Sequence, residues 1–184
     1  HVINKLSPTI EGWRQRVSLG AGIKMPTGSF LRRGYDDRLE PHRQIGSGST
    51  DFIFDVQWLV IADKLGWDIY AGYKANTANK INFRFGNTIN VRAIVFYSLP
   101  VKKSAITPMA GVSFEHNGTS TINNFGVYWK DSGGQLLLAQ AGLDYFINNI
   151  GINLMAQVPV VQKLNGEQFS NTARLSFGVR YVIN

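Results

Sequence analysis

Charged residues recur two positions apart in several apolar segments, and they are the side chains of this sequence best suited to contact a solute. Residues two apart share one face of a β-strand, so this spacing gathers the charges on a single polar face. Guanidinium groups around a narrow passage with low-dielectric walls favour anionic solutes. The residues that we assign to this solute-contacting face are Arg14, Arg16, Lys74, Arg84, Arg92, Arg174, Arg180, Asp55 and Asp144.

The same charges also fit an interpretation in which they pair with one another and fill the interior of a small closed barrel. An unpaired buried charge is costly, so each cation would then need an acidic partner. In such a barrel of about eight strands, the interior has room only for side chains. The sequence leaves both possibilities open.

Catalysis and metal binding find little support in the residue pattern. His1, His42 and His116 are isolated, and the chain has no cysteine that could supply a thiolate ligand. Ser113, Glu115 and His116 lie close in sequence, but strand alternation would point His116 away from the other two. We therefore predict no enzyme activity, no cofactor and no bound metal, and a solvated loop position for His42.

Composition narrows the class of protein further. The net charge of +7 suggests nucleic acid as a partner, but the cations are dispersed at strand spacing instead of clustering with stacking aromatic residues. We therefore predict no nucleic-acid binding. The sequence also has no apolar run of ~18 residues, the length that a membrane-spanning helix requires.

The elements that would position the charged face are about eight strands of roughly eleven residues, near the length of a tilted transmembrane strand. Each segment alternates bulky apolar residues with small, polar or charged ones, as Phe52, Phe54 and Val56 alternate with Ile53 and Asp55. The predicted connections alternate between long and short, as in outer-membrane barrels, which places both termini on the periplasmic side. The predicted strands are 13–24, 51–62, 67–74, 83–97, 105–116, 137–145, 150–160 and 172–183.

The direction in which the two faces point decides between a membrane barrel and a soluble one. A lipocalin-like barrel would turn its bulky face inward, whereas a membrane barrel turns it toward lipid. Glycines such as Gly20, Gly72 and Gly142 share the charged face and suit a crowded interior. We therefore predict an all-β, antiparallel, up-and-down transmembrane β-barrel with the charged face inside.

Closure of such a barrel would bring like charges together. Pairing of the last strand with the first places Arg174 and Arg180 beside Arg14 and Arg16, with no acid nearby in either strand. Like charges on neighbouring strands are destabilising. Either additional strands intervene, or something anionic binds there.

Two motifs resemble an outer-membrane barrel family of proposed transporters in the phenol meta-degradation pathway. The first motif, GAGIKMPTG at 20–28, ends a predicted strand, and the second, GSGSTDF at 46–52, begins the next. The resemblance implies a porin-like barrel of a Gram-negative outer membrane and passage of small organic molecules. Family members carry further strands ahead of the first motif, which implies that this chain is part of a larger barrel of about twelve strands.

These observations predict one domain, 1–184, which is a complete barrel or the C-terminal part of a longer chain. Its expected function is an outer-membrane channel for small anionic or aromatic solutes, in contact with membrane lipid. The alternative is a non-conducting structural or accessory barrel that binds partner proteins through loops 25–50 and 117–133. A lesser alternative is a soluble lipocalin-like barrel that binds a ligand.

Overall fold

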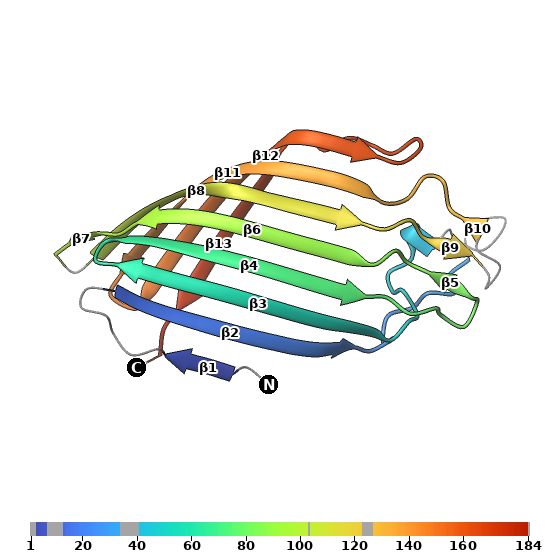
Figure 1. Cartoon of the computed structure of the whole chain (residues 1–184), viewed down its shortest axis with the longest axis horizontal. Coiled ribbons are helices and arrows are strands. Elements are labelled where there is room, and N and C mark those ends of the chain that lie inside the picture. The colour runs from blue at the N-terminus through green and yellow to red at the C-terminus, as the bar shows by residue number, and fades with distance from the viewer. Residues whose placement is uncertain (1–2, 7–12, 34–40, 103, 123–126, 184) are drawn as a thin grey trace.

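The computed structural model describes residues 3–6, 13–33, 41–102, 104–122 and 127–183, and it shows an all-β chain with antiparallel pairing (Figure 1). One large sheet has the strand order β1-β2-β3-β4-β6-β8-β11-β12-β13, and β7 extends it by pairing with β8. Its strands are β1 (Ile3–Leu6), β2 (Trp13–Lys24), β3 (Asp51–Ala62), β4 (Leu65–Ala75), β6 (Thr88–Tyr97), β7 (Leu99–Val101), β8 (Ser104–Asn117), β11 (Gly134–Ile147), β12 (Ile150–Leu164) and β13 (Arg174–Tyr181).

A second, smaller sheet lies in the loops, where β9 pairs with both of its neighbours. It consists of β5 (Phe83–Arg84), β9 (Thr121–Ile122) and β10 (Val127–Tyr128). The one helical element among the described residues is a single 3-10 turn, Pro41–Arg43. No helix of the described chain is long and apolar enough to cross a membrane.

All eight predicted strands have a counterpart in the large sheet, but the prediction for 83–97 was wrong in one respect. The alternation of Phe83 and Phe85 suggested one continuous strand, whereas the structure has β5, a break and then β6. At this break Gly86 packs against the backbone of Gly118, and a Cβ added to Gly86 would lie 1.8 Å from the Gly118 carbonyl oxygen. The structure also adds β1, which sequence alternation did not predict.

Two prolines that sit inside predicted strands mark irregularities of the sheet. Pro108 lies in β8 between two segments of pairing. On one side Phe96 of β6 pairs with Met109, and on the other side Leu99 of β7 pairs with Ile106 in the same register. Because proline has no N–H, it cannot donate to this ladder, which accounts for the interruption between β6 and β7. Pro159 adjoins a register shift in the β11–β12 ladder, as expected of a β-bulge.

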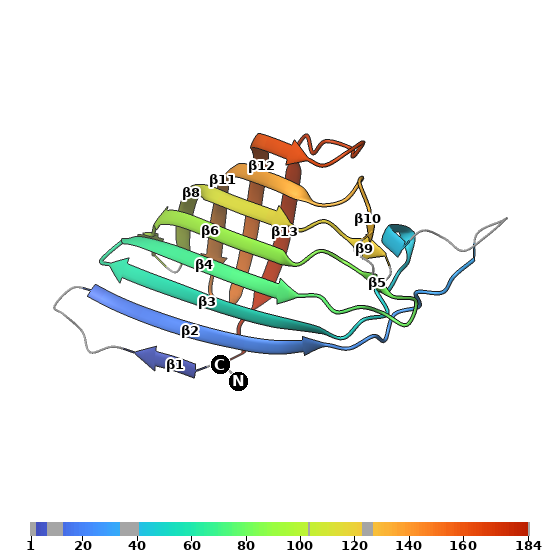
Figure 2. The same ribbon diagram turned by 45° about the vertical axis from the view of Figure 1, so that its right-hand side comes forward.

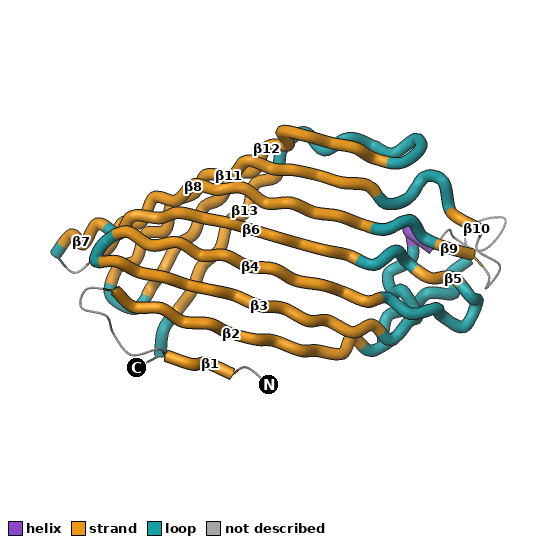
Figure 3. Tube along the Cα trace, in the orientation of Figure 1, coloured by secondary structure: helices purple, strands orange, loops and turns teal. Residues whose placement is uncertain are grey.

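The connections differ at the two ends of the sheet, which we call the loop end and the turn end. The turn end holds short reversals in which Asp63, Lys102 and Asn148 adopt positive φ angles of 53°, 53° and 50°. The loop end holds the long connections, which are teal in Figure 3, and the small sheet of β5, β9 and β10, whose strands are orange there. The predicted alternation of long and short connections is therefore present.

The large sheet curls, so that β11, β12 and β13 pass behind β2, β3 and β4 (Figures 1 and 2). Within the described residues β13 pairs only with β12, and β1 pairs only with β2, so the sheet keeps two free edges. In both views the end of β13 lies near β1. The structure thus establishes an all-β antiparallel sheet, and closure into a barrel is not observed in it.

Exposure follows the predicted alternation and defines an outer and an inner face of the curled sheet. On the outer face of β13, Leu175, Phe177 and Val179 are 79%, 71% and 66% exposed. On the inner face, Asp51 and Leu138 are fully buried. The bulky apolar rows therefore point away from the interior, opposite to the arrangement that a soluble lipocalin-like barrel requires.

Candidate functional site

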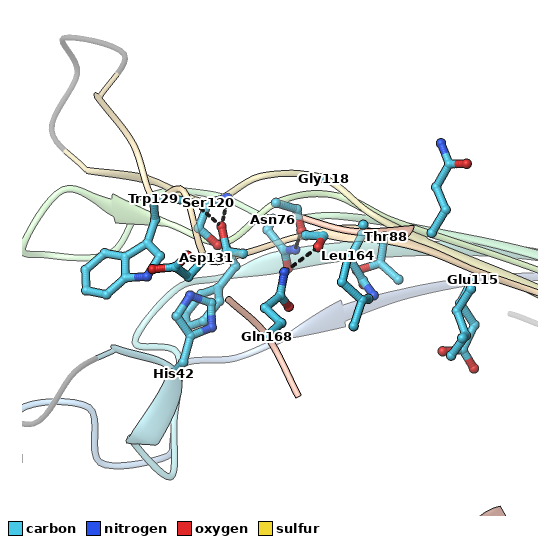
Figure 4. Close-up of a pocket in the computed structure, with 18 of the residues that line it drawn as sticks. His42, Asn76, Thr88, Glu115, Gly118, Ser120, Trp129, Asp131, Leu164 and Gln168 are labelled. Carbon is cyan, nitrogen blue, oxygen red and sulfur yellow. Dashed lines mark hydrogen bonds between the residues drawn. The ribbon is translucent and has the colours of Figure 1, made fainter. Parts of the chain in front are cut away.

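A cavity of about 860 Å³ opens at the loop end, where the strands of the large sheet meet the loops (Figure 4). Its walls come from the loop-end termini of β2, β3, β4, β6, β8, β11, β12 and β13 and from the connections between them. Because it leads onto the inner face of the curled sheet, this cavity is the candidate functional site.

The first part of the cavity rim is a hydrogen-bond network around the buried carboxylate of Asp51. Lys24 forms an ion pair with it at 2.6 Å and also contacts the hydroxyl of Ser47. The backbone N–H of Thr77 donates to the other carboxylate oxygen at 3.2 Å, and its hydroxyl donates to the carbonyl of Thr50 at 2.7 Å. Asp51 thereby fastens the 25–50 loop to the loop after β4.

The two sequence motifs of the 25–50 loop meet at this rim. Lys24 comes from the first motif and Asp51 from the second, and Gly28 packs against Gly46 so closely that a Cβ on Gly46 would lie 2.3 Å from the Gly28 carbonyl oxygen. Only glycine fits such an approach of two backbones. The motifs therefore have an architectural role, because they hold the two ends of the loop together.

The second part of the rim joins the loop after β8 to the loop after β12. The Asn165 side chain donates to the carbonyl of Ser132 at 3.0 Å, and the Gln168 side chain donates to the carbonyl of Gly133 at 2.7 Å. Asp131 accepts a hydrogen bond from the backbone N–H of Glu167 at 2.9 Å. These bonds order a wall of the cavity that the sequence did not reveal.

An aromatic cluster forms one side of the cavity mouth, visible around His42 and Trp129 in Figure 4. The His42 ring makes edge contacts with Phe83, Phe85 and Trp129, at centroid distances of 5.7, 5.2 and 6.0 Å. Phe83 is buried beneath it. The prediction that His42 is simply solvated was incomplete, because the ring packs against the small sheet although the residue remains exposed.

One ion pair of the cavity lining spans the inner face. Arg174 of β13 donates to the two carboxylate oxygens of Glu115 of β8 through its two terminal nitrogens, Nη1 and Nη2, at 2.5 and 3.1 Å. Two strands, β11 and β12, lie between these partners in the sheet order. The side chains can meet only because the sheet curls toward its inner face.

A second network occupies the inner face nearer the turn end. Asp68 accepts hydrogen bonds from Arg92 at 3.0 Å and from Gln57 at 2.8 Å, and Arg92 also lies over the Tyr70 ring at 5.5 Å. The Arg92 Nε and the hydroxyl of Ser113 are buried without a hydrogen-bond partner in the described structure. Pairing of charges, the second interpretation of the sequence, therefore applies to part of the inner face.

The nine residues that the sequence analysis assigned to solute contact have different surroundings in the structure. Lys74 and Arg174 line the cavity, whereas Arg14 and Arg16 lie on the inner row of β2, exposed and without a polar partner among the described residues. Arg92 belongs to the Asp68 network.

The remaining four of these residues have different surroundings. Arg180 lies over the Phe146 ring at 5.6 Å. Asp144 accepts a hydrogen bond from Asn153, and Asp55 occupies the inner row of β3 opposite Gly20. Arg84 lies outside the large sheet, in β5, where its Nε donates to the carbonyl of Asn76 at 2.9 Å.

Neither catalysis nor metal binding gains support from the geometry. Ser113 and Glu115 lie on the inner row of β8, and His116 lies on the alternate row. Across the residues that the structure describes, no group of three or more His, Asp or Glu side chains could hold a metal ion.

Comparisons with known proteins complete this description. No protein-family model, curated protein or solved structure matches the chain. The resemblance to outer-membrane transporters, which depends on motifs 20–28 and 46–52, stays a prediction.

Proposed function

We propose that this chain forms the wall of an outer-membrane β-barrel that passes small polar solutes. The observation that carries the proposal is the division of exposure between the two faces, with apolar rows outside and charged networks inside. Exposed apolar patches of this extent are rare on soluble monomers and indicate a membrane or protein contact. Transfer of each Leu, Val or Phe side chain from water to an apolar phase contributes about 1.5–3 kcal/mol.

Aromatic residues at the turn end agree with a membrane boundary there. On the outer face, the Trp13 and Trp67 rings contact each other edge to face, with their centroids 5.5 Å apart. Val60 of β3, which pairs with Trp67, is buried between β2 and β4. Trp and Tyr favour the boundary between lipid and water, because an amphipathic ring satisfies both phases.

The inner face is biased toward cations, which favours anions among the ions that cross. Arg14, Arg16 and Lys74 have no acidic partner in the described part of the chain, and neither does Arg180. Among the described residues, the inner carboxylate of Asp55 has no hydrogen-bonding partner. It faces Gly20 on β2 and Gly72 on β4. A net positive lumen raises the local concentration of anions.

A second candidate function is a non-conducting barrel that serves as a structural or accessory subunit. Ile94, Leu136 and Leu138 are buried on the inner face at 8%, 5% and 0% exposure, which favours a filled interior. The loops proposed for partner contacts, 25–50 and 117–133, include positions 34–40 and 123–126, which lie outside the described residues.

Conductance separates the two candidates. The full chain, refolded in detergent and verified by circular dichroism, is inserted into a planar bilayer. We expect discrete ionic steps with a reversal potential that indicates anion preference. Silence from the verified folded protein would refute the channel and leave the non-conducting barrel.

Charge reversal tests the assigned lumen. Arg16→Glu replaces an inner cation and should move the reversal potential toward cations. Lys163→Glu makes the same charge change at an exposed outer position of β12 and is the matched control. An unchanged reversal potential in Arg16→Glu would contradict a cationic lumen.

A further inference from the structure

The charges that line the loop-end cavity cancel, which distinguishes it from the cationic inner face. Apart from His42, the cavity lining has four cationic and four acidic side chains: Lys24, Arg43, Lys74 and Arg174 against Asp51, Glu115, Asp131 and Glu167. Two of the cations are already held in ion pairs, by Asp51 and Glu115. A ligand in this cavity would therefore meet no net charge, so electrostatic attraction does not select an anion there.

Uncharged hydrogen-bonding side chains dominate the rest of the polar lining, and several keep free capacity. Asn171 accepts a hydrogen bond from Arg174 through its side-chain oxygen at 3.4 Å, which leaves its amide nitrogen available. Asn117 accepts from Thr88 through its oxygen, which leaves its amide nitrogen available. Gln168 donates through its nitrogen, which leaves its oxygen available. The cavity thus presents both donors and acceptors, as a ligand with hydroxyl groups requires.

Aromatic side chains line the same cavity. Trp129 and Phe85 belong to the cluster with His42, and Phe169 of the loop after β12 is fully exposed. An aromatic ring offers a flat apolar surface for the C–H groups of a ligand, while neighbouring polar groups fix its orientation.

We propose that the loop-end cavity binds a small uncharged polyhydroxylated solute, the size of a mono- or disaccharide. Its volume of about 860 Å³ is within the range of small-molecule sites. A hydroxyl group both donates and accepts hydrogen bonds, as the amide side chains of the cavity lining do. An uncharged ligand also suits a lining whose four cationic and four acidic side chains balance. The inference deepens the proposed function, because it names the solute class that enters at the mouth of the same barrel.

Intrinsic fluorescence offers a direct measurement of binding, since one of the four tryptophans lines the cavity. Trp13, Trp58 and Trp67 lie on β2, β3 and β4, and their replacement by Phe leaves Trp129 as the reporter. Glucose, maltose and lactose are titrated into the detergent-refolded full chain, with gluconate and benzoate as charged comparisons. We expect saturable changes in Trp129 emission with at least one sugar and none with the two anions.

Calorimetric titration of variants assigns that binding to the cavity. Asn117→Ala and Asn171→Ala each remove one hydrogen-bonding side chain from the cavity lining and should weaken binding about fivefold. Circular dichroism of each variant checks that its fold is intact. Tyr128→Phe changes an exposed residue outside the cavity lining and is the control, with unchanged affinity expected.

The outcomes separate this inference from the proposed function. Binding of gluconate or benzoate in place of the sugars would overturn the inference, as would failure of all three sugars to bind. A protein that conducts ions without binding any sugar refutes only the inference. A protein that binds a sugar without conducting refutes only the channel.

Discussion

The ion pair between Arg174 and Glu115 should hold the curled sheet together, and its removal offers the sharpest test of the inner face. The two contacts, at 2.5 and 3.1 Å, form a bidentate bridge between β13 and β8. The side chains are 35% and 26% exposed, which lies between a surface pair and a buried one. Exposed pairs contribute about 0–1 kcal/mol, and loss of one partner of a buried pair costs about 3–5 kcal/mol. We therefore expect Arg174→Gln to lower the free energy of unfolding by about 2 kcal/mol.

A double-mutant cycle measures the interaction itself. Arg174→Gln, Glu115→Gln and the double variant are unfolded in urea from detergent micelles, and the coupling energy should be about 1–2 kcal/mol. Arg180→Gln combined with Glu115→Gln is the matched control, because Arg180 lies on the same strand but forms no ion pair with Glu115. Coupling below about 0.5 kcal/mol in the first cycle, or equal coupling in both, would refute the bridge.

Two further substitutions test the outer face and the crowding of the inner face. Phe177→Arg places a charge on the proposed lipid surface and should reduce the free energy of folding into vesicles by about 2–4 kcal/mol, whereas Ser176→Arg on the adjacent inner position should change it less. Equal losses in both variants would argue against lipid contact. Gly111→Ala on the inner row of β8 introduces a Cβ that would lie 2.1 Å from the backbone carbonyl oxygen of Ala93 and should destabilise the fold by about 1–3 kcal/mol in urea unfolding. Gly22→Ala, whose Cβ would have its nearest neighbour at 3.9 Å, is the control, and similar effects of the two substitutions would contradict the close packing of β8 against β6 at Gly111.

Alternation of residue type was sufficient to locate the eight long strands, although not β1, because side chains on a pleated strand point to opposite faces whatever the strand packs against. The eight long strands and the membership of each row follow from this local rule. Arg84 shows its limit. The alternation continues through Phe83 and Phe85, but the strand is interrupted where Gly86 closely approaches Gly118. That contact joins segments more than thirty positions apart, so the local pattern of 83–97 carries no sign of it.

The sequence by itself determined the strands, the two faces and the alternation of long and short connections, all of which depend on neighbours within a few positions. Only the tertiary structure decided how charges on different strands combine, as when Arg174 reaches Glu115 across two intervening strands. It also decided that the loop-end cavity exists, because Asp51, Trp129 and Gln168 come from separate loops. Such contacts depend on the curl of the sheet and the course of its loops, which no local pattern encodes.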